Sequence, residues 1–323
     1  MATLSNNDTF CPTKFVGDMG DMILSSADSV EFQLLKGGTL ILKENYSPAN
    51  GTIRIGGLSA VIDTVLYGEL KNSGAQANLA ADFTFKVGDA TLLTKKLYAS
   101  HQINTLDRNG AKNILSHARQ DVCYPGFTHP LSIIYTATAK LCAADGSTIA
   151  TNTLYKGANV RTINCDPAVL FPQNYSNGAY IRYETGAADG GDVFTSYIDH
   201  RRYADASLIR FLNMYDAPES LLVKQPIEVK PQSKDDVGVS YGTRNRYSIE
   251  PTDEYTASSG LLASLSEYHV WRDFSMSRKA EILHEGEWLP ILVTKSNFTR
   301  LTGGDNLGEA KISFQMAKSA LSI

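Results

Sequence analysis

Short stretches of alternating apolar and polar residues dominate the chain. In one of the first, Val30, Phe32 and Leu34 fall on a single face of an extended segment. The glycine pair Gly37-Gly38 separates this run from a second alternating run, Thr39–Glu44. Because glycine readily takes the positive φ that tight hairpins require, this stretch predicts a strand, a turn and a second strand.

Two further dipeptides carry the same hairpin signal. Asn50-Gly51 precedes the run Thr52–Ile55, and Asp145-Gly146 lies between the runs 133–141 and 148–155. Asn-Gly and Asp-Gly tolerate positive φ at both central positions of a tight turn. Each dipeptide therefore predicts a two-residue hairpin turn.

Alternation continues to the C-terminus, whereas helical periodicity is rare. Further strand-like runs occupy 82–87, 91–99, 180–184, 193–198, 207–212, 279–284, 287–294 and 309–318. Helical spacing is found in Leu58–Leu66 and again in Leu261, Leu262, Leu265 and Tyr268. These patterns predict an all-β protein of β-sandwich-like domains with one or two short helices.

Two breaks in the pattern predict three domains. The first is the alanine-rich connection Lys71–Ala81, and the second comprises Asp166-Pro167 and Phe171-Pro172, where the residue before each proline is driven away from helical geometry. We therefore expect an N-terminal β-rich domain over 1–80, a second β-sandwich-like domain over 81–165, and a C-terminal β-rich assembly domain over 166–323.

The third predicted domain has features suited to contact with other proteins. Pro226 interrupts the run Leu221–Val229, which favours an edge strand. The segment Asp235–Glu250, flanked by Lys234, predicts a charged, solvated hairpin. Tyrosine suits both sheets and interfaces, and six tyrosines cluster here: Tyr175, Tyr180, Tyr183, Tyr197, Tyr203 and Tyr215.

Composition excludes several classes of protein. The 323 residues are 43% hydrophobic and 20% charged, which is enough apolar material for folded cores. The net charge of −4 argues against a dedicated nucleic-acid-binding surface. No run approaches the ~20 apolar residues of a membrane span, and we expect no secretory leader at the N-terminus.

No known motif marks a catalytic or cofactor-binding residue in the sequence. The sequence has no nucleophile elbow, P-loop or H-E-x-x-H motif. Asp18–Asp21 and Asp189–Asp192 combine carboxylates with glycine, but neither has EF-hand spacing, and turn formation is the simpler interpretation. Each of the six histidines is expected to be an ordinary residue with a hydrogen-bond partner.

The four cysteines, Cys11, Cys123, Cys142 and Cys165, are widely spaced and form no C-x-x-C pair. We expect them to be buried, reduced thiols without metal. No catalytic, cofactor-binding or metal-ligating residue is therefore predicted, no cofactor is expected, and the chain is not expected to be an enzyme.

Three long segments, 15–55, 208–229 and 277–317, carry a family resemblance. They include "FVGDMGDMILSSADSVEF", "LIRFLNMYDAPESLLVKQPIEV" and "SRKAEILHEGEWLPILVTK". Taken in order, they resemble structural proteins of the tail or baseplate kind that are encoded by phages and prophages of Bacteroides-type bacteria. The resemblance implies a β-rich virion protein of the tail, assembled in the host cytoplasm. It also implies a homo-oligomer that contacts other tail proteins and meets a host-surface glycan at most indirectly.

Three hypotheses follow, and they predict different surfaces. A phage tail, baseplate or fibre-attachment component should have large interfaces and assemble symmetrically. A carbohydrate-binding or adhesin module should present an aromatic platform with polar groups. A glycan hydrolase on a β scaffold should have a deep pocket with two suitably separated carboxylates.

Overall fold

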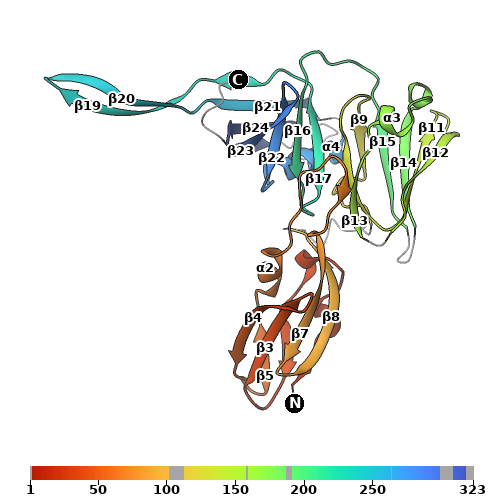
Figure 1. Cartoon of the computed structure of the whole chain (residues 1–323), viewed down its shortest axis with the longest axis vertical. Helices are drawn as coiled ribbons and strands as arrows, with labels where there is room; N and C mark the ends of the chain where they lie inside the picture. Colours follow the sequence, from red (N-terminus) through yellow and green to blue (C-terminus); the bar gives the residue numbers. More distant parts are fainter. Residues whose placement is uncertain are drawn as a thin grey trace.

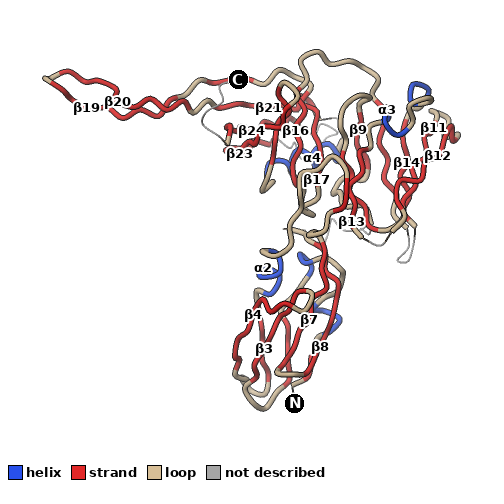
Figure 2. The backbone as a smooth tube through the Cα atoms, in the orientation of Figure 1, coloured by secondary structure: helices blue, strands red, loops and turns tan. Residues whose placement is uncertain are grey.

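The computed structural model describes residues 2–101, 113–157, 159–186, 191–262, 264–298 and 308–317. The prediction of an all-β fold is confirmed, because strands in six sheets make up most of the described chain and the helices are short (Figures 1 and 2). One end of the molecule is an N-terminal lobe, residues 2–101. The remaining described residues form a body, from which a two-stranded arm projects (Figure 1).

The lobe is a sandwich of two antiparallel sheets. Its outer elements include α1 (Asn7–Phe10), η1 (Val16–Asp18) and α2 (Leu58–Asp63). One sheet has the order β1-β2-β5, formed by Thr3–Leu4, Met22–Ser25 and Thr52–Ile55. The other has the order β4-β3-β7-β8, formed by Thr39–Tyr46, Val30–Lys36, Ala80–Val87 and Ala90–Tyr98. The alternating residues Phe32, Leu34, Phe83 and Phe85 are fully buried between them.

The body contains a five-stranded sheet packed near a small sheet. The order β12-β11-β14-β15-β9 joins Thr148–Tyr155, Ala137–Cys142, Tyr180–Thr185, Val193–Ile198 and Gln120–Cys123. The order β10-β13-β6 joins Pro130–Ile134, Val160–Asn164 and Gly74–Ala75. Strand β6 belongs to residues 2–101, so this segment of the chain adds one short strand to a sheet of the body. The short helices α3 (Pro167–Leu170) and η3 (Tyr175–Asn177) connect β13 to β14.

A seven-stranded sheet completes the body. Its order β17-β16-β22-β23-β24-β21-β18 joins Pro218–Val223, Ser207–Leu212, Ala280–His284, Glu287–Phe298, Glu309–Met316, Glu254–Leu261 and Glu228–Lys230. Helix α4 (Leu265–Ser275) buries Trp271 and Phe274 in a core shared with the five-stranded sheet. The two larger sheets of the body are therefore held together by one continuous apolar cluster.

Strand pairing crosses both boundaries that the sequence suggested. Strand β7 begins at residue 80 and pairs with β3, so a division between 80 and 81 falls at the start of a strand that belongs to the lobe. Strand β14 follows residue 165 but pairs with β11, which precedes it. We propose instead that the lobe ends near residue 101 and that the two larger sheets of the body divide near residue 200.

Most of the predicted turns are confirmed, with one correction. Gly37-Gly38 and Asn50-Gly51 form two-residue turns with positive φ at all four residues. Asp145-Gly146 lies in a hairpin, but the prediction of a two-residue turn is wrong. The hydrogen bonds from Ala143 N to Ser147 O and from Gly146 N to Ala143 O enclose three residues, with Gly146 left-handed at the third.

The second predicted helix is displaced. Leu261 ends strand β21 and its side chain is 86% exposed, whereas α4 begins at Leu265 and continues to Ser275. The Ser264 hydroxyl accepts a hydrogen bond from Glu267 N, which fixes the start of the helix. The first helix is confirmed as α2, although it ends at Asp63.

Candidate functional site

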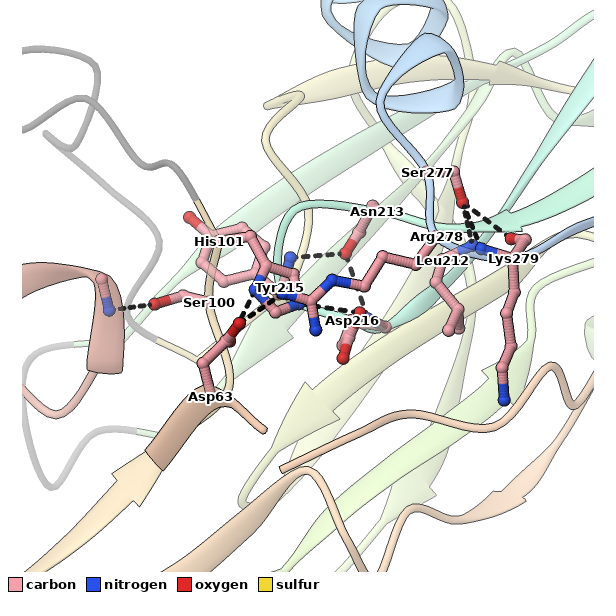
Figure 3. Close-up of polar contacts among 12 residues, drawn as sticks. Asp63, Ser100, His101, Leu212, Asn213, Tyr215, Asp216, Ser277, Arg278 and Lys279 are labelled. Carbon is pink, nitrogen blue, oxygen red and sulfur yellow. Dashed lines mark hydrogen bonds and ion pairs between the residues drawn. The ribbon is translucent and has the colours of Figure 1, made fainter. Parts of the chain in front are cut away.

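A cavity of about 390 Å³ lies where the lobe meets the body, and four of the ionisable side chains that line it pair with one another (Figure 3). Asp63 is the last residue of α2, and His101 follows β8. Asp216 lies in the turn between β16 and β17, and Arg278 lies between α4 and β22. The lobe and the body thus contribute two residues each to this junction cluster.

The junction cluster is closely paired. The His101 Nδ1 atom lies 2.6 Å from Asp63 Oδ1, and its Nε2 atom lies 2.9 Å from Asp216 Oδ1. The Arg278 guanidinium pairs with the other oxygen of Asp63 and lies 3.0 Å from His101 Nδ1. Two carboxylates therefore face two cationic groups across the boundary between lobe and body.

These pairs shift the ionisation of His101 and Asp63. Burial opposes the charged imidazolium, but hydrogen bonds and negative charge from Asp216 and Asp63 outweigh it and raise the pKa of His101 to about 9. Burial also opposes the Asp63 carboxylate, but His101 and Arg278 lower its pKa. An unfolded histidine has a pKa near 6.5. The stabilising effect of His101 is therefore complete below about pH 6.5 and is lost as the pH rises toward about 9.

Backbone contacts hold the same boundary. The His101 amide donates to Met214 O at 2.5 Å. Asn213 Oδ1 accepts from the amides of Tyr215 and Ala217 and so fixes the β16–β17 turn. Gly68 lies against that turn so closely that a Cβ atom there would overlap the Asp216 carbonyl group. The absence of a side chain at residue 68 is thus a condition for docking the lobe on the body.

A second buried polar group extends from the junction cluster into the body. Glu219 accepts hydrogen bonds from Ser116 at 3.0 Å and Asn213 at 2.9 Å. Burial and the negative charge of Asp273 raise the pKa of Glu219 to about 7. Nearby, His117 Nδ1 lies 3.4 Å from Asp273 Oδ1. Since an unfolded glutamate ionises near pH 4.3, folding favours protonated Glu219, and this contribution is lost as the pH rises toward about 7.

The geometry of the junction cluster suits structural attachment better than catalysis. Both ring nitrogens of His101 face carboxylates, so the charged imidazolium has no lone pair with which to accept a proton. The Ser100 hydroxyl beside it accepts a hydrogen bond from Gly17 N at 2.7 Å. Within the described ranges, no group of three or more His, Cys, Asp or Glu residues could hold a metal ion.

The carboxylates considered for calcium have protein partners. Asp21 pairs with Arg54, and Asp18 accepts a hydrogen bond from Thr13. Asp192 accepts hydrogen bonds from the amides of Asn113 and Ile114 and also pairs with Arg119. Asp189, named with Asp192 in the same prediction, lies outside the described residues. The described carboxylates in these groups thus stabilise turns and segment contacts.

The remaining residue predictions have mixed outcomes. The four cysteines are buried and unpaired, and burial raises the pKa of Cys11 to about 11. Tyr183 and Tyr215 are buried in the cores, whereas Tyr197 is 47% exposed. The expectation of a hydrogen-bond partner is confirmed for His200, whose Nε2 atom lies 3.0 Å from Gly178 O. No helix among the described residues is long and apolar enough to cross a bilayer.

The predicted charged hairpin is the projecting arm, formed by β19 (Ser233–Ser240) and β20 (Thr243–Pro251) (Figure 1). These strands pair only with each other among the described strands. Tyr241 and Gly242 form its tip, both with positive φ. The arm continues the pairing of β18 with β21, so it is rooted in the seven-stranded sheet. It is the candidate interaction surface of the molecule.

Comparisons with known proteins give only remote similarities. No protein family and no curated protein matches the chain. Two similar solved structures come from gene transfer agent (GTA) particles. One, from the tail of an empty particle with C6 symmetry, is 11% identical and has a TM-score of 0.26, with the match covering 38% of this chain and 98% of the other. The second, from a native GTA virion, is 8% identical with a TM-score of 0.25, covering 36% and 95%.

A third similar structure is a mutant of Salmonella alpha-2-macroglobulin, 9% identical with a TM-score of 0.18, and the match covers 90% of this chain and 24% of that one. At such TM-scores none of the three similarities supports an argument about function.

Proposed function

We propose that the protein is a virion structural protein, acting as an oligomeric assembly subunit of a phage tail or baseplate or as an attachment point for fibres. In this role it is not an enzyme, its partners are further copies of itself and other tail proteins, and it is assembled in the host cytoplasm. The single observation that carries the proposal is the projecting arm. The resemblance of the three sequence segments described above agrees with it.

The arm exposes large apolar side chains to solvent, which is unfavourable for a hairpin that has no partner. Val237 and Val239 are 60% and 67% exposed, and Tyr241 at the tip is fully exposed. An isolated two-stranded hairpin is at best marginally stable in water, and a row of unpaired backbone groups along a strand invites pairing with another chain. These properties favour an arm that is covered by a partner in the assembled state.

The register of the arm defines the chemistry of the face to be covered. Val237 lies opposite Arg246, and Val239 lies opposite Arg244. Directly opposed residues share one face of an antiparallel pair, so two valines and two arginines lie together. The partner surface is therefore expected to combine apolar area with acidic groups.

The direction of the arm favours a head-to-tail assembly. It extends away from the body of its own chain (Figure 1). An arm that docks on the body of the next copy makes a heterologous contact, and repetition of such a contact generates a ring or a filament. Both outcomes suit a tail component.

The test removes the arm without disturbing its root. Thr252 N donates to Gln232 O at 2.8 Å, so Ser233–Pro251 can be replaced by an Asn-Gly turn between these two residues. We expect the intact protein to form oligomers in sedimentation and electron microscopy, and the shortened protein to stay folded but monomeric. The double variant Val237→Ser/Val239→Ser should weaken assembly, whereas Leu40→Ser, at a 50% exposed leucine of the lobe, should not.

Two results would contradict the proposal. The first is an intact protein that remains a monodisperse monomer at high concentration and is absent from purified particles. The second is unchanged assembly after removal of the arm.

A further inference from the structure

A hollow of about 680 Å³ lies on the body, away from the arm and the junction cluster. Its walls come from three connections: the one that follows β9, the short helix η3, and the loop between β15 and β16. They combine three aromatic and three basic side chains, namely Phe127, Tyr175, Tyr203, His200, Arg201 and Arg202. None of these residues belongs to the arm or to the junction cluster.

The loop between β15 and β16 is held in shape by one carboxylate. Asp199 accepts hydrogen bonds from Arg201 Nε at 2.9 Å and Nη2 at 2.8 Å, and from the Tyr203 hydroxyl at 2.8 Å. These bonds, above all those from Arg201, hold the pKa of Asp199 well below its usual range. The Arg201 charge is thus neutralised internally, and the Tyr203 ring is fixed in place.

The neighbouring arginine remains available to a ligand. Within the described part of the chain, Arg202 has no ion-pair or hydrogen-bond partner, and it is exposed. Lys224 Nζ lies 5.8 Å from the centre of the Tyr203 ring and adds a second cation behind it. Asp205 is the other acidic residue of the loop. Together with the Asp199–Arg201 pair, these residues comprise three cationic and two acidic side chains, a sum of +1.

The rings give the hollow a second kind of surface. Tyr175 is partly buried against the main core of the body, which restricts its motion. Tyr203 packs edge-on to Tyr124 with ring centres 5.8 Å apart. Flat rings offer apolar area to the C–H face of a sugar ring, while a planar guanidinium matches a carboxylate through two parallel hydrogen bonds.

We propose that this hollow binds an acidic saccharide, with Arg202 on the sugar carboxylate and Tyr175 against a sugar ring. The volume lies within the range of small-ligand sites. A free phosphate would use the positive charge but not the three aromatic rings, so the combination favours a carboxylated sugar. The inference does not depend on the assembly role, because the arm and the hollow share no residues.

The test uses the full chain and three probes: a disaccharide containing glucuronic acid, the neutral disaccharide of the same linkage, and inorganic phosphate. We expect calorimetry or ligand-observed NMR to show binding of the acidic disaccharide at least ~10-fold tighter than binding of the other two probes. Arg202→Gln should weaken it by ~10-fold or more, because hydrogen bonds to a charged group are lost. Arg182→Gln, at an exposed arginine on β14, is the matched control and should change nothing.

A pair of variants tests the ring. Tyr175→Phe should preserve affinity and Tyr175→Ala should reduce it several-fold, with thermal unfolding used to verify that both variants are folded. The proposal is overturned if the acidic disaccharide does not bind, if the neutral sugar or phosphate binds equally well, or if Arg182→Gln weakens binding as much as Arg202→Gln.

Discussion

Substitution of Gly68 by alanine gives a sharp test of how the lobe is attached to the body. A Cβ atom at residue 68 would overlap the Asp216 carbonyl oxygen and lie 2.8 Å from its carbonyl carbon. No φ constraint applies at Gly68, so the expected effect is steric. The β16–β17 turn would have to move to avoid this overlap. It is fixed by hydrogen bonds to Asn213, and it contains Asp216, which pairs with His101.

The expected loss of stability is large because the overlapping atoms belong to the backbone of Asp216 and cannot rotate away. Overpacking usually costs about 1–3 kcal/mol, and a clash between two backbone segments should reach the upper part of that range. With an unfolding entropy of ~2.1 cal/mol/K per residue, a loss of about 3 kcal/mol lowers the melting temperature of this 323-residue chain by ~4–5 °C. The His101 amide, which donates to Met214 O, should also lose protection from hydrogen exchange.

The matched control is Gly186→Ala. A Cβ atom there would meet the Thr136 side chain and backbone no closer than 3.8 Å, which is ordinary van der Waals contact, so its melting temperature should stay within ~2 °C of the parent. Calorimetry and hydrogen exchange measure both variants. Equal melting temperatures for Gly68→Ala and Gly186→Ala, with unchanged exchange at His101, would refute the proposed close contact.

Two further predictions concern titratable groups. Stability should fall as the pH is raised from 6 to 9.5, because Glu219 and His101 both have raised pKa values in the fold. The His101 part corresponds to about 3 kcal/mol, so denaturant titrations of His101→Gln should show a clearly smaller decline than the parent. The four buried thiols should react with a thiol reagent only on unfolding, since burial suppresses the thiolate; rapid labelling of two or more in the native protein would contradict this.

Local features of the fold could be predicted from the sequence, and partnerships between distant segments could not. Gly37-Gly38 and Asn50-Gly51 define their turns through backbone preference alone. The Asp145-Gly146 loop is one residue longer than the sequence predicts, because a three-residue loop with glycine at its end has nearly the same sequence pattern as a two-residue turn. Strands β3 and β7 pair although they lie more than forty positions apart in the sequence. No local sequence pattern indicates this pairing. The predicted domain boundary therefore fell at the start of a strand.

The sequence does not predict the junction cluster, for the same reason. His101 is separated by 177 positions from Arg278, and around each of these residues the sequence looks ordinary. A buried histidine between two carboxylates becomes visible only when the fold brings them together. The charged hairpin, by contrast, could be predicted because its two strands are adjacent in sequence and lie close to their turn.

The root of the arm explains how a marginal hairpin can act as a defined contact. Its strands continue from the pair Lys230 and Glu254, in a sheet whose core includes Phe211, Trp271 and Phe314. The sheet fixes the register and direction of the arm before any partner arrives, so the entropy lost on docking is smaller than for a free peptide. In the proposed assembly, the exposed valines and arginines supply the contact itself. The residues that orient the arm are thus distinct from those proposed to bind a partner, and the two sets can be tested by independent substitutions.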